Sequence, residues 1–353
     1  MLIHGIVFGL LAAAAQSSVY VFSRMFVTTP GNSPRMLFAL SHAWMGLFAA
    51  ALLPFCMSAD VLNVRGYGLP LAGACAFYLI GQLCLFQAIQ WTDASRVSPL
   101  LGLKILMLAC IAAFVLGQDV TSLQWVAVIV SLTAASALNY SGGSIPTRGI
   151  VLILGACLLY ALSDLSIVRL TRVLAPHHEF GGILMACCLC YLVCGLVGGV
   201  LVVAGPREHR SRDRWRRALP VGLAWFVAMV FLYVCFNAVG ALFGNILQAM
   251  RGPFSVLIGA VIARVGWVHL EQRLTRGVLL RRLLAALLMV VAIGLYVHGS
   301  RRPHGAEDGP ARLLDVPQEE RVFPDRHVRV ALDVLAEERQ RQGALRDGLL
   351  DDP

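Results

Sequence analysis

Long apolar segments separated by short polar connections cover the first 298 residues of this chain. Ten such segments can be delimited, at 3–22, 36–57, 69–89, 97–117, 122–140, 150–170, 181–204, 218–236, 241–264 and 278–298. Each has about the length that an α-helix needs to cross the hydrocarbon core of a bilayer, and each is too long for a barrel strand. Open strand edges find no water at that depth. The pattern therefore predicts an all-α integral membrane protein with ten transmembrane helices.

The last five segments follow the same order as the first five. His-Gly-Ile-Val opens the first segment at residue 4, and Arg-Gly-Ile-Val opens the sixth at residue 148, which is 144 residues later. Pro99 and Pro253 are separated by 154 residues, and so are Thr121 and Thr275. Five is an odd number, so two such copies face opposite ways across the membrane. We therefore expect two inverted five-helix repeats, at 1–141 and 149–298.

Composition and charge agree with a membrane location. The chain is 58% hydrophobic and only 14% charged, which is well below the share of charge in ordinary soluble domains. Residues 1–298 hold 20 basic and 8 acidic residues, and most of the basic ones lie in short connections between apolar segments. Such positions set membrane topology and contact anionic lipid headgroups, whereas a nucleic-acid interface gathers its basic residues on one face. We expect a multi-pass protein of the cell (inner or plasma) membrane and no nucleic-acid partner.

Residues 299–353 form a polar tail with 9 arginines and 12 acidic residues. This composition predicts a partly helical or disordered appendage outside the two repeats.

The fourth and fifth segments carry a familiar pattern. Asp93-Ala94-Ser95-Arg96-Val97-Ser98-Pro99-Leu100 precedes an apolar run that ends in Leu116-Gly117-Gln118-Asp119-Val120-Thr121. In the second half, Pro253 is followed by Leu270-Glu271-Gln272-Arg273-Leu274-Thr275. Over about residues 1–298 the chain resembles the EamA-type members of the drug/metabolite transporter superfamily. The resemblance implies ten transmembrane helices in two five-helix repeats, and transport of small molecules.

Two arguments about orientation disagree. The odd-numbered connections between segments hold thirteen arginines and the even-numbered ones hold three. Positively charged connections stay in the cytoplasm, so this count places both termini outside. The family resemblance instead implies that both termini are inside.

Three charged residues within the apolar segments are candidate site residues. Lys104, the only lysine of the chain, lies in the fourth segment, Asp164 in the sixth and Arg251 in the ninth. A lysine near the bilayer centre costs roughly 3 kcal/mol on insertion scales, so we expect Lys104 to face the bundle interior or water. The functional interpretation is a central cavity where Lys104 and Arg251 attract an anionic or zwitterionic group, with Asp164 as counter-ion or proton-coupling site. The alternative is a structural salt bridge between helices.

Uncharged polar residues complete the predicted substrate-binding cavity. The candidates are Gln82, Gln87, Asn245 and Gln248. Helices in membranes commonly use such side chains to bond to one another, so each of them is also compatible with a purely structural role.

Catalytic and cofactor motifs are absent from the sequence. A phosphate-binding loop needs Lys followed by Ser or Thr, but the only lysine precedes Ile105, and neither His-Glu-x-x-His nor Gly-x-Ser-x-Gly occurs. The ten cysteines have no polar partners at ligand spacing, so we interpret them as packing residues rather than metal ligands. We expect no enzyme activity, no cofactor and no metal.

The leading interpretation is a secondary transporter, or permease, that moves small organic metabolites by alternating access between two inverted repeats. A flippase for a lipid-linked substrate and a non-transporting membrane assembly or receptor protein are the alternatives. The expected partners are a small-molecule metabolite and membrane lipid. A coupling ion and a homodimer are compatible with the same pattern.

Overall fold

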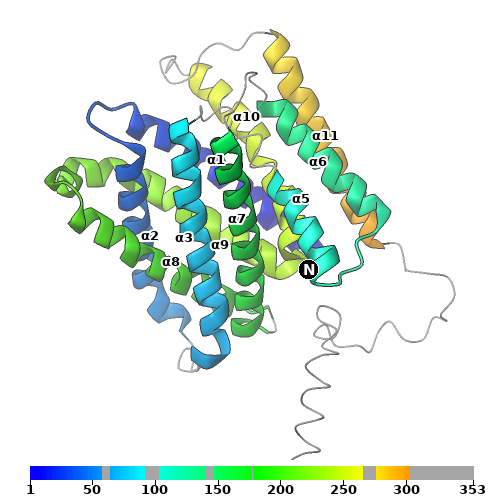
Figure 1. Ribbon diagram of the computed structural model, residues 1–353, viewed down its shortest axis with the longest axis horizontal. Helices are drawn as coiled ribbons and strands as arrows, with labels where there is room; N and C mark the ends of the chain where they lie inside the picture. The colour runs from blue at the N-terminus through cyan, green and yellow to red at the C-terminus, as the bar shows by residue number, and fades with distance from the viewer. Residues whose placement is uncertain (58–63, 92–102, 140–146, 177, 265–275, 302–353) are drawn as a thin grey trace, which may run out of the picture. The chain divides into compact units, whose positions relative to one another are not determined.

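A computed structural model describes residues 1–57, 64–91, 103–139, 147–176, 178–264 and 276–301 (Figure 1). The elements in chain order are α1 (Leu2–Val27), α2 (Pro34–Cys56), α3 (Val64–Trp91), α5 (Leu103–Cys110), η2 (Ile111–Val115), α6 (Ser122–Asn139), α7 (Thr147–Leu174), α8 (Phe180–Ala204), η3 (Arg207–Arg210), α9 (Arg212–Gln248), α10 (Arg251–Arg264) and α11 (Arg276–Arg301). All of these are helices, and this part of the chain contains no strand. The predicted tail from residue 302 onward and the motifs at 93–100 and 270–275 lie outside the described residues.

Six of the described helices are long and apolar enough to cross a membrane. They are α1, α2, α7, α8 and α9 over their full lengths, and α3 over Val64–Leu85. Shorter apolar helices cover Leu103–Val115, Ser122–Ala134 and Leu287–Gly299. The predicted all-α class is confirmed for the described residues, and several of their helices have the length and composition of membrane spans.

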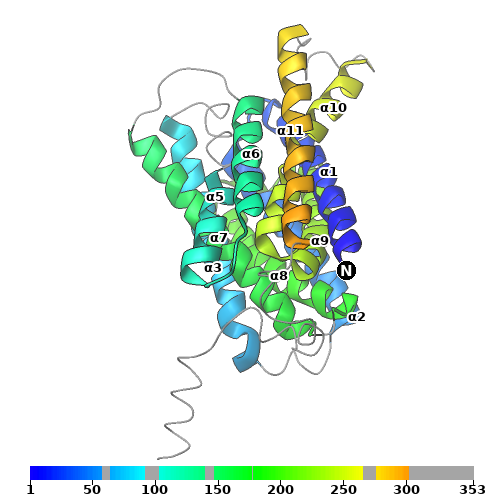
Figure 2. The same cartoon turned by 90° about the vertical axis from the view of Figure 1, so that its right-hand side faces the viewer.

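The helices pack in pairs that join distant parts of the chain. Within the unit that contains residues 1–110 and 120–302, α1 packs against α9, α3 against α7, α2 against α8, and α6 against α11 (Figures 1 and 2). The α2–α8 pair meets at Gly46 and Gly195, where a Cβ on Gly46 would lie 2.7 Å from the Gly195 Cα. Small residues let helix backbones approach closely, and van der Waals contact then holds the pair together in lipid.

The α1–α9 pair also meets at glycine. A Cβ on Gly9 would lie 2.7 Å from a side-chain carbon of Leu247 and 3.0 Å from the sulfur of Cys235. Larger residues at position 9 would therefore push α1 away from the part of α9 that carries the polar residues described below.

The backbone of α9 and the start of α10 depart from helical geometry in two places. Gly240 has φ 78° and ψ 170°, a conformation that residues with a side chain rarely adopt, yet the helix resumes and ends only at Gln248. The second break precedes Pro253. Proline has no N–H to donate, and the Ala249 carbonyl instead accepts from the Gly252 N–H at 3.2 Å. The sequence placed one boundary between 236 and 241, whereas the structure has a kink there and ends the helix later.

The helical run from α5 ends differently. In the second unit of the chain, residues 111–119 begin with the π-helix η2, in which the Leu116 N–H bonds to the Ile111 carbonyl at 3.0 Å. Gly117 follows with φ 62°. The described helix ends at Val115, two residues before the predicted end at 117, and residues 97–102 of the predicted span lie outside the described residues.

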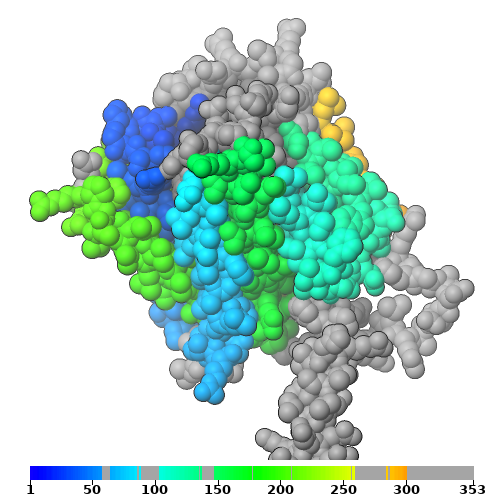
Figure 3. Space-filling view, viewed as in Figure 1, coloured from blue at the N-terminus to red at the C-terminus, as the bar shows by residue number. Residues whose placement is uncertain are grey.

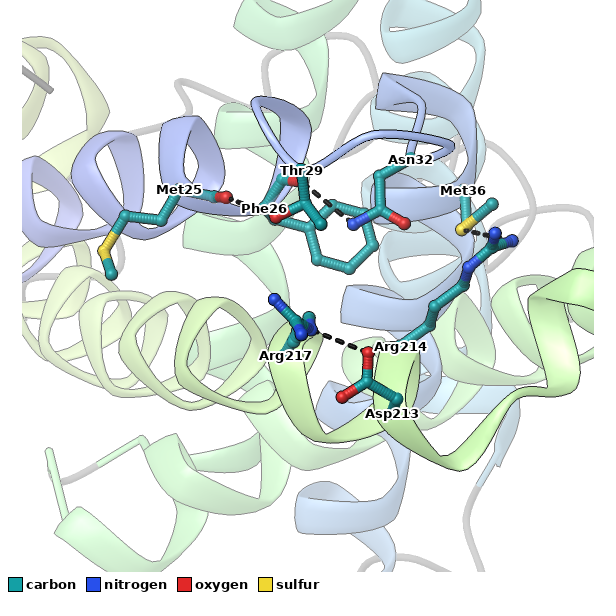
Figure 4. A network of polar contacts seen from close by, with 8 residues as sticks. All are labelled: Met25, Phe26, Thr29, Asn32, Met36, Asp213, Arg214 and Arg217. Carbon is teal, nitrogen blue, oxygen red and sulfur yellow. Dashed lines mark hydrogen bonds and ion pairs between the residues drawn. The ribbon is translucent and has the colours of Figure 1, made fainter. Parts of the chain in front are cut away.

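The turn between α1 and α2 lies beside the start of α9 (Figure 4). The Asn32 amide donates to a backbone carbonyl of the last α1 turn and closes this connection. Arg214 approaches the Met36 sulfur at 3.7 Å, and Arg217 pairs with Asp213 at 2.7 Å on the exposed surface of α9. Two of the arginine-bearing odd-numbered connections thus occupy the same end of the bundle, as the pattern of segments predicts.

Candidate functional site

One face of α7 carries the chemistry of the site. Cys157, Tyr160 and Asp164 follow one another at spacings of three and four residues, which places them on the same side of a helix. The helix packs against α3, α5 and α9, and Figure 3 shows the surfaces of α3 and α7 side by side. Asp164 is only 6% exposed. A carboxylate at such a position needs a partner, because an isolated buried charge is strongly destabilising.

Lys104 supplies that partner from the first turn of α5. Its Nζ lies 2.5 Å from the Asp164 Oδ2, and the two side chains are 22% and 9% exposed. The same ammonium lies 5.9 Å from the centre of the Tyr160 ring, within the range of a cation–π contact. The structure thus brings the only lysine of the chain onto the polar face of α7.

Asn245 of α9 binds the same oxygen of the Asp164 carboxylate as Lys104 does. Its Nδ2 donates to the Asp164 Oδ2 at 2.7 Å and to the Ala241 carbonyl at 2.8 Å. The ammonium and the amide therefore share one carboxylate oxygen, and no described residue donates to the other oxygen. Three helices, α5, α7 and α9, are linked through this single acid.

Arg251 is the first residue of α10 and follows Gln248 by three residues. The Arg251 backbone carbonyl accepts a hydrogen bond of 2.8 Å from the Ser17 hydroxyl of α1. Among the described residues no acid pairs with the Arg251 guanidinium. The described part of the chain thus provides an acid partner for Lys104 and none for Arg251.

Two further polar groups near this face are buried without a partner. Gln248 is 5% exposed and neither atom of its side-chain amide forms a hydrogen bond, and the hydroxyl of Tyr160 is also unpaired. Each such group costs about 1–3 kcal/mol relative to a paired one. Gln248 follows Asn245 by three residues and so lies on the same side of α9. A bound polar ligand or ordered water would satisfy these groups.

Comparison with known families now identifies the first part of the chain. Residues 3–140 match the model of the EamA-like transporter family. The resemblance inferred from the sequence is confirmed for this EamA-like segment, which contains Gln82 and Lys104. The family that this segment matches consists of membrane transporters, which suggests transport of small molecules in a lipid environment.

The fold also matches solved structures. One protein of known crystal structure superimposes with a TM-score of 0.61 over 84% of this chain and 99% of its own, at 16% sequence identity. At that identity the likeness concerns the fold alone. No curated protein matches the chain.

The two glutamines predicted in the EamA-like segment differ in their surroundings. Gln82 of α3 is buried and lies one helical turn after Tyr78, on the same side of the helix. Tyr78 in turn bonds to the His42 ring at 2.8 Å, and its own ring lies 6.3 Å from that of Tyr160. Gln82 therefore belongs to a polar and aromatic chain that reaches the α7 face. Gln87 is exposed on α3 and takes no part in these contacts.

Sequence reasoning missed Tyr160 as a site residue, because a tyrosine in an apolar segment is more often a packing residue. The signal was present, since Tyr160 precedes Asp164 by four residues and so shares its helix face. The partnership of Tyr78 with His42 in the EamA-like segment had no comparable signal, because the two residues lie 36 positions apart on different helices.

Proposed function

We propose that the protein is a secondary transporter that moves small organic metabolites by alternating access between two inverted five-helix repeats. The repeats are 1–141 and 149–298, and residues 299–353 are an appendage. The substrate site comprises Lys104, Asp164, Asn245, Gln248 and Arg251, with Gln82 and Gln87 on the α3 side. The observation that carries the proposal is the linkage of Lys104, Asp164 and Asn245 across three helices of a membrane domain whose first part is EamA-like.

The pairing of the helices supports the two-repeat arrangement. If α1, α2, α3, α5 and α6 are the five helices of one copy, then α7 to α11 are those of the other. The first helix of each copy packs against the third of the other, in the pairs α1–α9 and α7–α3. The first also meets the fourth, in the pairs α1–α10 and α7–α5, and second meets second in α2–α8. Such reciprocal pairing is what a two-fold axis in the membrane plane would produce.

The origin of the site residues supports alternating access. Lys104 belongs to the first copy, whereas Asp164, Asn245 and Arg251 belong to the second. Any rocking of one copy against the other would change the distance between Lys104 and its carboxylate. The breaks at Gly240 and before Pro253 bracket Asn245 and Gln248, and discontinuous helices of this kind surround substrate sites in carriers.

Flux through proteoliposomes tests the transport function. Purified full-length protein is reconstituted and assayed for uptake of a broad panel of small metabolites, and wild type is compared with Lys104→Ala. The matched control is Arg217→Gln, which also breaks an ion pair, but on an exposed surface. We expect flux of at least one compound that Lys104→Ala loses and Arg217→Gln retains. Unchanged flux in Lys104→Ala would remove the site but keep the transporter. A folded wild type that moves no panel member would contradict transport.

A further inference from the structure

We infer that the substrate is a small organic monoanion, a carboxylate or an acid of similar size, that also carries an uncharged hydrogen-bonding group. This inference rests on the proposed transport function and specifies the substrate class of the same site. It follows from the charge count, from the Arg251 guanidinium, with which no described acid pairs, and from the unpaired amide of Gln248.

The charge count sets the sign of the occupant. The proposed site has two cations, Lys104 and Arg251, and one anion, Asp164, so these described residues leave one net positive charge. An uncompensated charge inside a membrane domain is costly, so an occupant with one net negative charge neutralises the site. A zwitterion would leave the excess positive charge in place, and a cation would double it.

Arg251 is the natural receptor for the anionic group. The Lys104 ammonium is already engaged by Asp164, whereas no described acid pairs with Arg251. The planar guanidinium presents its N–H donors in a fork that matches both oxygens of a carboxylate. Its backbone carbonyl, not its side chain, holds the contact to Ser17. The side chain can therefore serve a ligand without giving up that structural contact.

Gln248 defines the second group of the substrate. Its amide offers one acceptor and two donors, carries no charge, and is buried without a partner three residues before Arg251. The unpaired Tyr160 hydroxyl adds another donor and acceptor on the facing helix. A hydroxyl or amide on the substrate would pair with these groups, and an analogue that lacks it would leave them unsatisfied. Sites of this kind discriminate strongly against such analogues.

The test uses matched compounds that differ in one group. Each carbon frame is supplied as a carboxylate, a primary amide and an amine that carry a hydroxyl, together with the carboxylate that lacks it. One set is lactate, lactamide, 1-amino-2-propanol and propionate. A second set is 4-hydroxybenzoate, its amide, 4-hydroxybenzylamine and benzoate. Protection of the full-length protein against thermal unfolding reports binding, and uptake into proteoliposomes reports flux. We expect protection and flux to be confined to carboxylates, with the hydroxylated member of a pair about tenfold tighter.

Two variants separate ligand recognition from structural roles. Arg251→Gln is expected to abolish protection by carboxylates while leaving the fold intact. Gln248→Met is expected to raise the melting temperature of the empty protein, because it removes an unpaired amide, and to erase the preference for the hydroxylated compound. Ser131→Ala is the matched control. Its hydroxyl is also buried and unpaired but lies on α6, so the melting temperature should rise with no change in ligand preference.

The outcomes distinguish the substrate class from transport itself. Flux of an amide or an amine that equals or exceeds that of its carboxylate would overturn the anion assignment and leave the transporter intact. Loss of stability in Gln248→Met, with the hydroxyl preference retained, would overturn the role of the amide. Absence of protection by every carboxylate would also overturn the inference.

Discussion

Replacing Lys104 with methionine is expected to destabilise the folded protein by about 2–4 kcal/mol. At the observed 2.5 Å between Nζ and Oδ2, the raw attraction is about 7 kcal/mol at an effective dielectric constant of 20. Desolvation of both ions offsets most of that attraction. Removing one partner alone leaves the other charge buried and costs about 3–5 kcal/mol, and the 22% exposure of Lys104 reduces this figure.

The assay is unfolding of the purified protein in mixed micelles by a denaturing detergent, with the free energy measured for a double-mutant cycle. Methionine keeps the length of the lysine stem, and Asp164→Asn keeps the shape of the acid and its bond with Asn245. The loss of unfolding free energy in the double variant is expected to be at least about 2 kcal/mol smaller than the sum of the losses in the two single variants. Arg217→Gln, on an exposed pair with side chains 50% and 67% exposed, is expected to change stability by no more than about 0.5 kcal/mol.

Additive effects of the two substitutions would refute the reasoning, because residues in direct contact must couple. A Lys104→Met protein as stable as wild type would refute it as well, since Asp164 would then have no need of its partner.

Three further predictions concern backbone geometry and one hydrogen bond. Gly195→Val is expected to lower the free energy of unfolding by about 1–3 kcal/mol, because an added Cβ collides with the α2 backbone in the α2–α8 pair. Gly199→Ala, which has open space around it, is expected to leave stability unchanged or to raise it in the same unfolding assay. Gly240→Ala is expected to lower the free energy of unfolding by about 1–2 kcal/mol because of the positive φ of Gly240, although nothing obstructs an added Cβ. Gly155→Ala, at an equally unobstructed position inside helix α7, is expected to raise the free energy of unfolding by up to about 1 kcal/mol. Equal effects of the two substitutions would contradict a strained backbone at Gly240. Ser17→Ala is expected to lower the free energy of unfolding by about 1 kcal/mol. It is also expected to increase hydrogen exchange at the start of α10, because the Arg251 carbonyl loses its hydrogen bond to the Ser17 hydroxyl of α1.

Much of the architecture could be predicted from the chain because apolar length and proline position act locally. The apolar segment around Cys187 exceeds the length of a bilayer crossing, and the corresponding helix α8 covers Phe180–Ala204. The break before Pro253 was also predictable, since proline cannot donate its missing N–H. The kink at Gly240 was not, because an isolated glycine inside an apolar run is compatible with an unbroken helix and only the packed structure selects its positive φ.

The site was predictable as a set of residue types but not as a geometry. Buried charges in apolar segments require partners, which is why Lys104, Asp164 and Arg251 could be singled out. Nothing local indicates that Asn245, 81 residues from Asp164, would bind the same carboxylate oxygen as Lys104. Such pairings depend on how α5, α7 and α9 come together, and that arrangement is set by the whole bundle.

The single lysine gives this protein an unusually clean spectroscopic reporter. Because only one residue in 353 carries a side-chain ammonium, isotope-labelled lysine would yield a single resonance, without mutation or chemical modification. That resonance would come from the ammonium held 2.5 Å from Asp164. Its chemical shift and its exchange with water could then be followed during turnover, so that the state of the central ion pair is observed directly in the native chain.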